Sequence, residues 1–145
     1  MEIKEKNILI VEYDLLSNKL MKKILEDEGY TVYSALDGEE GFVKFLEYDP
    51  DIVITNLRMP VLCGCELVDK IRETHQNVPV LFCTGEYVDG VNELLLIKKP
   101  IDVNVLKEKI LKALIQGSRL NTQQVSNFCK SKNDSKEVLL TESSL

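Results

Sequence analysis

The stretch PDIVITNLRMP, residues 50–60, decides how this chain folds. Apolar and β-branched side chains fill positions 52–55 without polar residues between them, which is typical of a parallel strand buried on both faces. Asn56 follows this run, and the next residues, Arg-Met-Pro, indicate a loop. Asn56 is therefore expected at the carboxyl end of a buried strand, the edge of an open α/β sheet where ligands bind. The question is why a neutral amide, and not an acid or a base, occupies that edge.

The rest of the chain alternates short apolar runs with segments of helical periodicity. The expected strands are residues 7–11, 30–35, 51–55, 78–83 and 93–98. The expected helices begin after the N-cap residues Asp14 and Asp37, span residues 65–74, and begin again after Asp102. Strands that alternate with helices form a parallel sheet. The sequence therefore predicts an α/β fold with a doubly wound five-stranded parallel sheet and helices on both faces.

The connection between the fourth and fifth strands is short. Only GEYVDGVN, residues 85–92, is available there, and it contains two glycines. A full helix does not fit, so the fourth helix is expected to be shortened to one turn or absent. In the second helix, by contrast, the spacing is regular, and we expect its apolar stripe to be Phe42, Val43, Phe45 and Leu46.

The composition fits one globular domain. The chain has 145 residues, of which 44% are hydrophobic and 29% charged, and its net charge is −6. This charge disfavours direct nucleic-acid binding, which needs a basic face. No apolar run reaches the roughly 18 residues that cross a membrane, and the first residues do not form a signal peptide. The four cysteines match neither a zinc pattern nor a disulfide framework, which predicts a reduced, cytoplasmic protein.

The chain changes character after residue 116. Residues 117–145 are rich in Ser, Asn, Gln and Lys and lack periodicity. Segments of this composition do not bury enough apolar surface to fold. We therefore expect a domain at residues 1–116 and a flexible tail or linker at residues 117–145.

Polar side chains gather where the predicted strands end. They are Glu12, Tyr13 and Asp14 after the first strand, Asn56 after the third, Thr84 after the fourth, and Lys98 or Lys99 after the fifth. Because the carboxyl ends of parallel strands meet at one edge of a sheet, these groups are expected to converge. Their convergence predicts a functional site at this edge.

Several short motifs carry a family resemblance. They are ILIVE at 8–12, DGEEG at 37–41, DIVITN at 51–56, MP at 59–60 with Gly64, VPVLFCT at 78–84 and KKP at 98–100. In this order and spacing, over about residues 6–116, they resemble the receiver domain of bacterial response regulators. The resemblance implies a flavodoxin-like fold and a role in two-component or phosphorelay signal transduction.

The resemblance also implies a set of functional positions. In that family an Asp at the end of the third strand accepts a phosphoryl group from a histidine kinase. Two acids after the first strand hold Mg²⁺, together with a backbone carbonyl two residues beyond the acceptor. A Thr or Ser after the fourth strand and a Lys before Pro contact the phosphoryl oxygens. An aromatic residue on the fifth strand swings inward to report the state.

Part of this set is retained. Glu12 matches the first acid, and Thr84 and Lys99 match the two residues that contact the phosphoryl group. The carbonyl of Arg58 would be the backbone ligand of the metal ion.

Other positions are substituted. Asn56 stands at the phosphoacceptor position, Tyr13 at the second acid, and Leu96 where the family has an aromatic residue. The segment between Thr84 and Lys99 is about seven residues shorter than in the family, nearly two helical turns. This removes most of a helix that in the family forms part of the output face.

These substitutions predict a site without phosphoryl chemistry. An amide nitrogen shares its lone pair with the carbonyl group, so Asn56 cannot act as the anionic nucleophile that phosphoryl transfer needs. With Asn56 and Tyr13 in place of carboxylates, Mg²⁺ binding at Glu12, Asn56 and the Arg58 carbonyl is expected to be weak or absent. We expect no cofactor, and we expect Lys99 to pair with Glu12, with the Asn56 amide bridging them.

The chain is therefore interpreted as a pseudo-receiver, a binding module and not an enzyme, that acts by protein–protein interaction without being phosphorylated. Its expected partner is a histidine kinase, an output domain or a second copy in a homodimer, with no direct contact to nucleic acid or membrane. One alternative is a working Mg²⁺-dependent receiver that uses another carboxylate, such as Asp14, or whose Asn56 was engineered. Another is an anion sensor that uses Thr84 and Lys99.

Two neighbours of Glu12 have simpler interpretations. Asp14 is expected to be the cap of the first helix and not a metal ligand. Tyr13 is expected to be a space-filling aromatic residue over the pocket.

Overall fold

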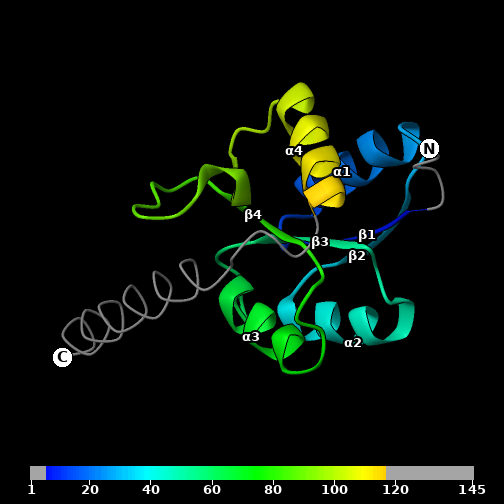
Figure 1. Ribbon diagram of the computed structural model, residues 1–145, viewed down its shortest axis with the longest axis vertical. Coiled ribbons are helices and arrows are strands. Elements are labelled where there is room, and N and C mark those ends of the chain that lie inside the picture. The colour runs from blue at the N-terminus through cyan, green and yellow to red at the C-terminus, as the bar shows by residue number, and fades with distance from the viewer. Residues whose placement is uncertain (1–5, 117–145) are drawn as a thin grey trace.

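The computed structural model describes residues 6–116, which form a three-layer α/β domain (Figure 1). Its five strands are β1 (Asn7–Val11), β2 (Thr31–Ala35), β3 (Ile52–Asn56), β4 (Val80–Thr84) and β5 (Leu96–Lys98). All neighbouring strands are parallel, in the order β2-β1-β3-β4-β5. This is the doubly wound order of flavodoxin-like folds, as the sequence predicts.

Two pairs of helices cover the two faces of the sheet. Helices α1 (Leu15–Asp27) and α4 (Val103–Gln116) lie on one face, and α2 (Gly38–Tyr48) and α3 (Gly64–Thr74) lie on the other (Figure 1). Side chains alternate along β1, so that Ile8 and Ile10 pack into the core under α1 and α4, while Leu9 and Val11 pack into the core under α2 and α3. Every residue of β3 and β4 is buried, which explains their unbroken apolar runs.

The predicted helix starts are confirmed. The Asp14 carboxylate accepts from the Ser17 N–H, and the Asp37 carboxylate accepts from the Glu40 N–H. Asp102 accepts from the N–H groups of Asn104 and Val105 at 2.9 and 3.2 Å. Each carboxylate satisfies amides that have no partner inside the helix.

The connection between β4 and β5 holds no α-helix. A single 3₁₀ turn, η1 (Glu93–Leu95), precedes β5, so the fifth strand begins at Leu96 and not at Glu93 as predicted. The prediction was wrong there because a three-residue turn and a strand present the same short apolar run. The second and fourth strands also begin later than predicted, at Thr31 and Val80.

The predicted apolar stripe of α2 is only half buried. Phe45 lies in the core, but Val43 and Leu46 are 59% and 56% exposed. Since α2 covers the edge of the sheet formed by β2 and β1, only a narrow side of the helix meets the core.

Two further predictions concern the tail and membrane-spanning helices. The predicted tail at residues 117–145 lies outside the described residues. Within residues 6–116, no helix is long and apolar enough to cross a membrane.

The start of α3 packs directly onto the end of β3. A Cβ atom at Gly64 would lie 2.3 Å from the backbone oxygen of Asn56, which is closer than a side-chain carbon comes to any backbone oxygen. The Gly64 N–H also donates to the Leu57 oxygen at 3.1 Å. Glycine at 64 therefore lets the loop after β3 fold back tightly beside Asn56.

We predict that Gly64→Ala lowers the free energy of unfolding by about 1–3 kcal/mol, the usual cost of forcing a group into a packed site. Gly85→Ala is the control, because a Cβ there would meet only Lys99 Cβ at 4.0 Å, and its effect should stay within about 0.5 kcal/mol. Urea unfolding followed by circular dichroism measures both. Equal effects of the two substitutions would contradict the close approach at Gly64.

Candidate functional site

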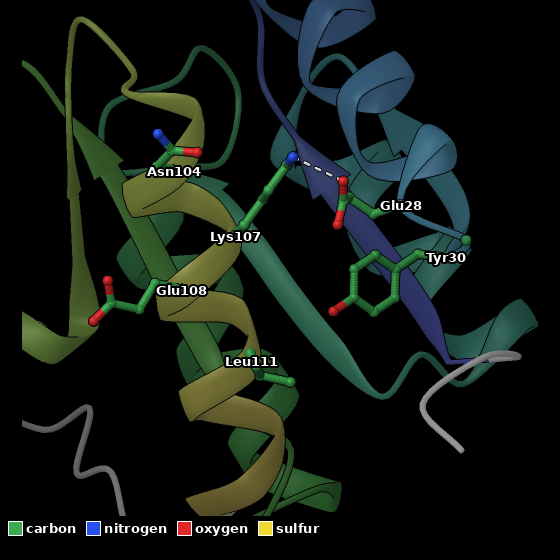
Figure 2. Close-up of a pocket in the computed structure, with 7 residues that line it drawn as sticks. Glu28, Tyr30, Asn104, Lys107, Glu108 and Leu111 are labelled. Carbon is green, nitrogen blue, oxygen red and sulfur yellow. Dashed lines mark ion pairs between the residues drawn. The ribbon is translucent and has the colours of Figure 1, made fainter. Parts of the chain in front are cut away.

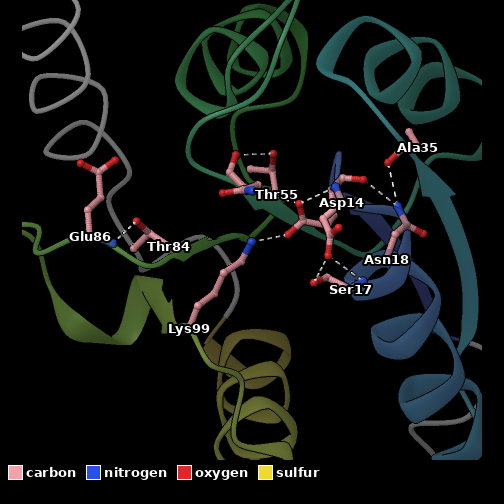
Figure 3. Close-up of polar contacts among 10 residues, drawn as sticks. Asp14, Ser17, Asn18, Ala35, Thr55, Thr84, Glu86 and Lys99 are labelled. Atoms are coloured by element: carbon pink, nitrogen blue, oxygen red, sulfur yellow. Dashed lines mark hydrogen bonds and ion pairs between the residues drawn. The ribbon is translucent and has the colours of Figure 1, made fainter. Parts of the chain in front are cut away.

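The carboxyl ends of the strands bring the predicted site residues together (Figure 3). Glu12 follows β1, Asn56 ends β3, Thr84 ends β4, and Lys99 follows β5. Lys99 reaches across the edge of the sheet toward the end of β1, where Asp14 lies. Glu12 and Lys99 are 87 residues apart in sequence, yet their side chains are in contact. The predicted convergence is therefore confirmed for Glu12, Asn56 and Lys99, whereas the Thr84 side chain bonds the loop that follows β4.

A buried carboxylate is the centre of the site. Glu12 has no exposed surface, and its Oε1 accepts from Lys99 Nζ at 2.6 Å. Its Oε2 accepts from Asn56 Nδ2 at 2.9 Å and from the Asp14 N–H at 3.1 Å. A buried charge needs such partners, because without them its desolvation is very costly. The three donors compensate the Glu12 charge from within the protein.

The pairing of Lys99 with Glu12 agrees with the prediction, but the bridging group differs. The Asn56 amide was expected to bridge the acid and the ammonium group. Instead, each oxygen of Glu12 takes one of these two donors, so Glu12 itself links Asn56 to Lys99. Carboxylates have two oxygens with separate lone pairs, which suits this role better than an amide.

The arrangement does not fit Mg²⁺. This ion requires near-octahedral coordination by oxygen, preferably charged. Glu12 is the one carboxylate of the predicted set, and both of its oxygens already accept from protein donors. No group of three or more His, Cys, Asp or Glu within residues 6–116 is placed to hold a metal ion. The Asn56 Nδ2 and Lys99 Nζ donors both bond the carboxylate that would have to bind the ion.

Thr84 is linked to the neighbouring loops. It is buried, and its Oγ1 accepts from the Glu86 N–H at 3.1 Å (Figure 3). The Glu86 carboxylate in turn accepts from Arg58 Nε at 2.7 Å. Arg58 was predicted only as a backbone ligand, but its side chain joins the loop after β3 to the loop after β4.

The remaining predicted positions are Asp14, Tyr13 and Leu96. Asp14 Oδ2 accepts from both the Oγ and the N–H of Ser17, and these two bonds, with a smaller contribution from the Lys99 charge, lower the pKa of Asp14. Tyr13 is 52% exposed, so it does not fill the pocket as predicted. Leu96 is buried in the core under α2 and α3.

Sequence reasoning missed Asn18. This residue is buried in α1, and its Nδ2 donates to the backbone oxygens of Glu12 at 3.0 Å and Ala35 at 2.9 Å. It therefore ties α1 to the carboxyl ends of β1 and β2, next to the site (Figure 3). The available signal was its spacing from Met21 and Leu25, since residues three and seven positions later share its helix face.

Grooves also lie on the side of the sheet that α1 and α4 cover. One, of about 490 Å³, lies between the end of α1 and α4 (Figure 2), where Lys107 pairs with Glu28 at 2.7 Å beside Tyr30 and Leu111. Burial, with a smaller effect of the Glu28 charge, raises the pKa of Tyr30. The other, of about 290 Å³, lies between α1 and the segment that follows β5, and Lys99 is the one predicted site residue on its wall.

Comparison with known proteins agrees with the geometry. Residues 8–111 match the family described as the response regulator receiver domain. The chain belongs to this family. A probable transcriptional regulator, ycf29, from Porphyra purpurea is 31% identical over 128 residues, which cover 82% of this chain and 61% of that protein.

Solved structures resemble the receiver domain closely. The N-terminal domain of a Wolinella succinogenes protein is 32% identical, with a TM-score of 0.68 over 77% of this chain and 94% of that one. The receiver domain of the hybrid histidine kinase CckA is 33% identical, with a TM-score of 0.66 over 74% and 98% of the two chains. The chain spans about a third to two thirds of the length of the curated relatives it matches, so it corresponds to one part of those proteins.

We predict that Lys99→Met destabilises this receiver domain because it leaves the Glu12 charge buried without its cation. Breaking a fully buried pair costs roughly 3–5 kcal/mol, and we expect about 2 kcal/mol here because the Lys99 side chain is 26% exposed. The control is Lys98→Met, since Lys98 and Glu93 are 68% and 78% exposed and such pairs contribute below about 1 kcal/mol. Similar losses in urea unfolding of both variants would contradict the role of Lys99.

The thiols near the site are predicted to be unreactive. Burial raises the pKa of the Cys83 thiol to about 12 and also raises the pKa of Cys63. Since the thiolate is the reactive form, iodoacetamide at about pH 8 should label Cys83 in denaturant but not in the folded chain. Mass spectrometry of the digested protein locates the label. Equal labelling of Cys83 in both conditions would show that it is not buried.

Proposed function

We propose that this receiver domain signals by protein–protein interaction without being phosphorylated. The observation that supports the proposal is the hydrogen bond from Asn56 Nδ2 to the buried Glu12 carboxylate. At the position that corresponds to the family's phosphoacceptor, the chain presents a donor that is bonded to the neighbouring acid. Phosphoryl acceptors are anionic oxygen nucleophiles, and this group is a neutral amide.

The pocket is proposed to be stable without a metal ion. Clustered carboxylates repel one another, which an added cation relieves. Here the site holds one buried carboxylate, and Lys99 together with Asn56 already compensates it. In this account the ammonium group and the amide replace the metal ion and hold the carboxyl ends of β1, β3 and β5 in one arrangement.

The alternative of a working receiver needs another acceptor. Asp14, two residues after Glu12, is the candidate, but its Oδ2 accepts two bonds from Ser17 as the cap of α1. An attack through this capping oxygen would remove its negative charge and so weaken both bonds. An Asn56 introduced by engineering would leave Tyr13 and Leu96 unexplained, together with the short segment after Thr84.

The partner is proposed to be another protein of a two-component or phosphorelay system. A histidine kinase, an output domain and a second copy of the chain are the candidates, and the domain is proposed to be a binding module and not an enzyme. The longer relatives include a probable transcriptional regulator, so an output domain that binds DNA fits the proposal. The net charge of −6 disfavours direct nucleic-acid binding by this chain itself.

The test is an NMR titration of the full chain with millimolar Mg²⁺, with and without beryllofluoride as a phosphoryl mimic. We expect the amide signals of Glu12, Asn56, Thr84 and Lys99 to stay unchanged, and we expect Mg²⁺ to add no stability, since a ligand stabilises only the state that it binds.

The matched variant is Tyr13→Asp combined with Asn56→Asp, which restores both carboxylates. Its pocket should gain Mg²⁺-dependent shifts and Mg²⁺-dependent stability, whereas Asn56→Asp alone should be destabilised by repulsion from Glu12. If the unmodified pocket responds to Mg²⁺ and beryllofluoride, and β5 responds with it, the proposal is wrong.

A further inference from the structure

The shortened segment after β4 presents an exposed aromatic side chain. Tyr87 is 81% exposed, more than any other large apolar or aromatic side chain in residues 6–116. An aromatic ring in water carries a large unburied apolar area. Burying the Tyr87 ring against another surface would therefore contribute more binding free energy than burying the side chain of another residue of the loop.

The segment that carries Tyr87 is held at several points. Before Tyr87 in the chain, the Glu86 carboxylate accepts from Arg58 Nε, and the Glu86 N–H donates to Thr84 Oγ1. After Tyr87, Val88 is buried in the core under α2 and α3. Tyr87 thus stands between two anchored residues, so its backbone does not need to be ordered on binding, which lowers the entropic cost of an interaction.

The end of the segment is also fixed. The Asn92 side chain caps η1 by accepting from the Leu94 N–H at 2.9 Å. Lys109 of α4 donates to the backbone oxygens of Glu93 and Leu96, which satisfies carbonyl groups at this edge of the sheet. The loop therefore has a defined path between β4 and β5 although it contains no α-helix.

The charge of the segment has one sign. Residues 85–93 contain the acids Glu86, Asp89 and Glu93 and no Lys or Arg. Arg58 and Lys98 pair with the first and the last of these, but Asp89 is exposed and forms no ion pair within residues 6–116. An uncompensated carboxylate two residues from an exposed ring complements a surface that combines an apolar slot with a basic border.

We propose that Tyr87 is the anchor of a protein-docking surface formed by residues 85–93, and that its partner is a protein segment in which basic side chains surround an apolar slot. The ring enters the slot, and Asp89 faces the basic border. Exposed aromatic residues on rigid supports are the usual anchors of protein interfaces. The proposal rests on the proposed function, because it names the surface through which the domain would act without phosphorylation.

The docking surface is joined to the pocket through one residue. Glu86 is adjacent to Tyr87 and donates its N–H to Thr84 Oγ1. A partner bound at Tyr87 would therefore act on Thr84 through Glu86, without phosphorylation at Asn56. This predicts that binding shifts the amide signals of Glu86 and Thr84 together with those of Val88 and Asp89.

The test uses the ¹⁵N-labelled full chain and a defined probe, a synthetic helical peptide with a stripe of Leu side chains along one face, between which a ring can insert, and Lys side chains along both borders of that stripe. A peptide with Glu in place of every Lys is the control for charge. We expect the Lys/Leu peptide to shift the amides of residues 86–91 and the Glu/Leu peptide to shift none of them. Absence of shifts at residues 86–91 with the Lys/Leu peptide would contradict the proposal.

Variants of the chain then distinguish binding through Tyr87 from non-specific electrostatic attraction of the basic peptide to an acidic protein. Tyr87→Ala should weaken the affinity for the peptide about tenfold or more, and Tyr87→Phe should preserve it, because the slot takes the ring. Leu16→Ala, at a side chain that is 77% exposed on α1, is the matched control and should change the affinity less than about twofold. Equal effects of Tyr87→Ala and Leu16→Ala, or loss of binding in Tyr87→Phe, would overturn the proposal.

The readouts distinguish this inference from the proposed function. A response of Asn56 and Lys99 to Mg²⁺ and beryllofluoride, with an intact peptide response at residues 86–91, would contradict only the phosphorylation-independent function. Silent pocket amides with no peptide response at Tyr87 would contradict only the docking surface.

Discussion

The arrangement of this receiver domain depends on the charge of one buried carboxylate. Glu12 has no contact with water, so its charge must be compensated by groups that the fold itself supplies. Lys99 provides the opposite charge and Asn56 provides an amide N–H, from two strands that are not neighbours of one another. In forming these bonds, the carboxylate fixes the carboxyl ends of β1, β3 and β5 relative to one another. The same bonds occupy the oxygens through which a metal ion would bind.

Hydrogen bonds and close packing from neighbouring residues hold this arrangement in place. Asn18 bonds the backbone oxygens at the ends of β1 and β2, and Gly64 allows the loop after β3 to pack against the Asn56 backbone. On the other side, Arg58 holds Glu86, which holds the hydroxyl of Thr84. The residues of the pocket therefore have partners within the protein. Through Glu86, the pocket residue Thr84 is joined to the exposed loop after β4.

Much of this could be predicted from the sequence, because the signals were local. Unbroken apolar runs such as residues 52–55 indicate buried parallel strands, and carboxylates such as Asp14 mark helix starts. The convergence of Glu12 with Lys99 followed from sheet topology.

Some errors had a different origin, since they depended on how distant segments pack together. Neither the exposure of Tyr13 nor the link from Arg58 to Glu86 has a signature in spacing. Val61 adopts a left-handed backbone with φ of 70°, which β-branched residues disfavour, and the sequence gives no sign of it.

The central claim, that Asn56 has replaced phosphoryl chemistry with a structural hydrogen bond, is tested most directly by intact-mass spectrometry of the full chain after incubation with a small-molecule phosphodonor and Mg²⁺. The account predicts no gain of a phosphoryl group in the unmodified chain. A chain that gains one phosphoryl group at a residue of the pocket would contradict it.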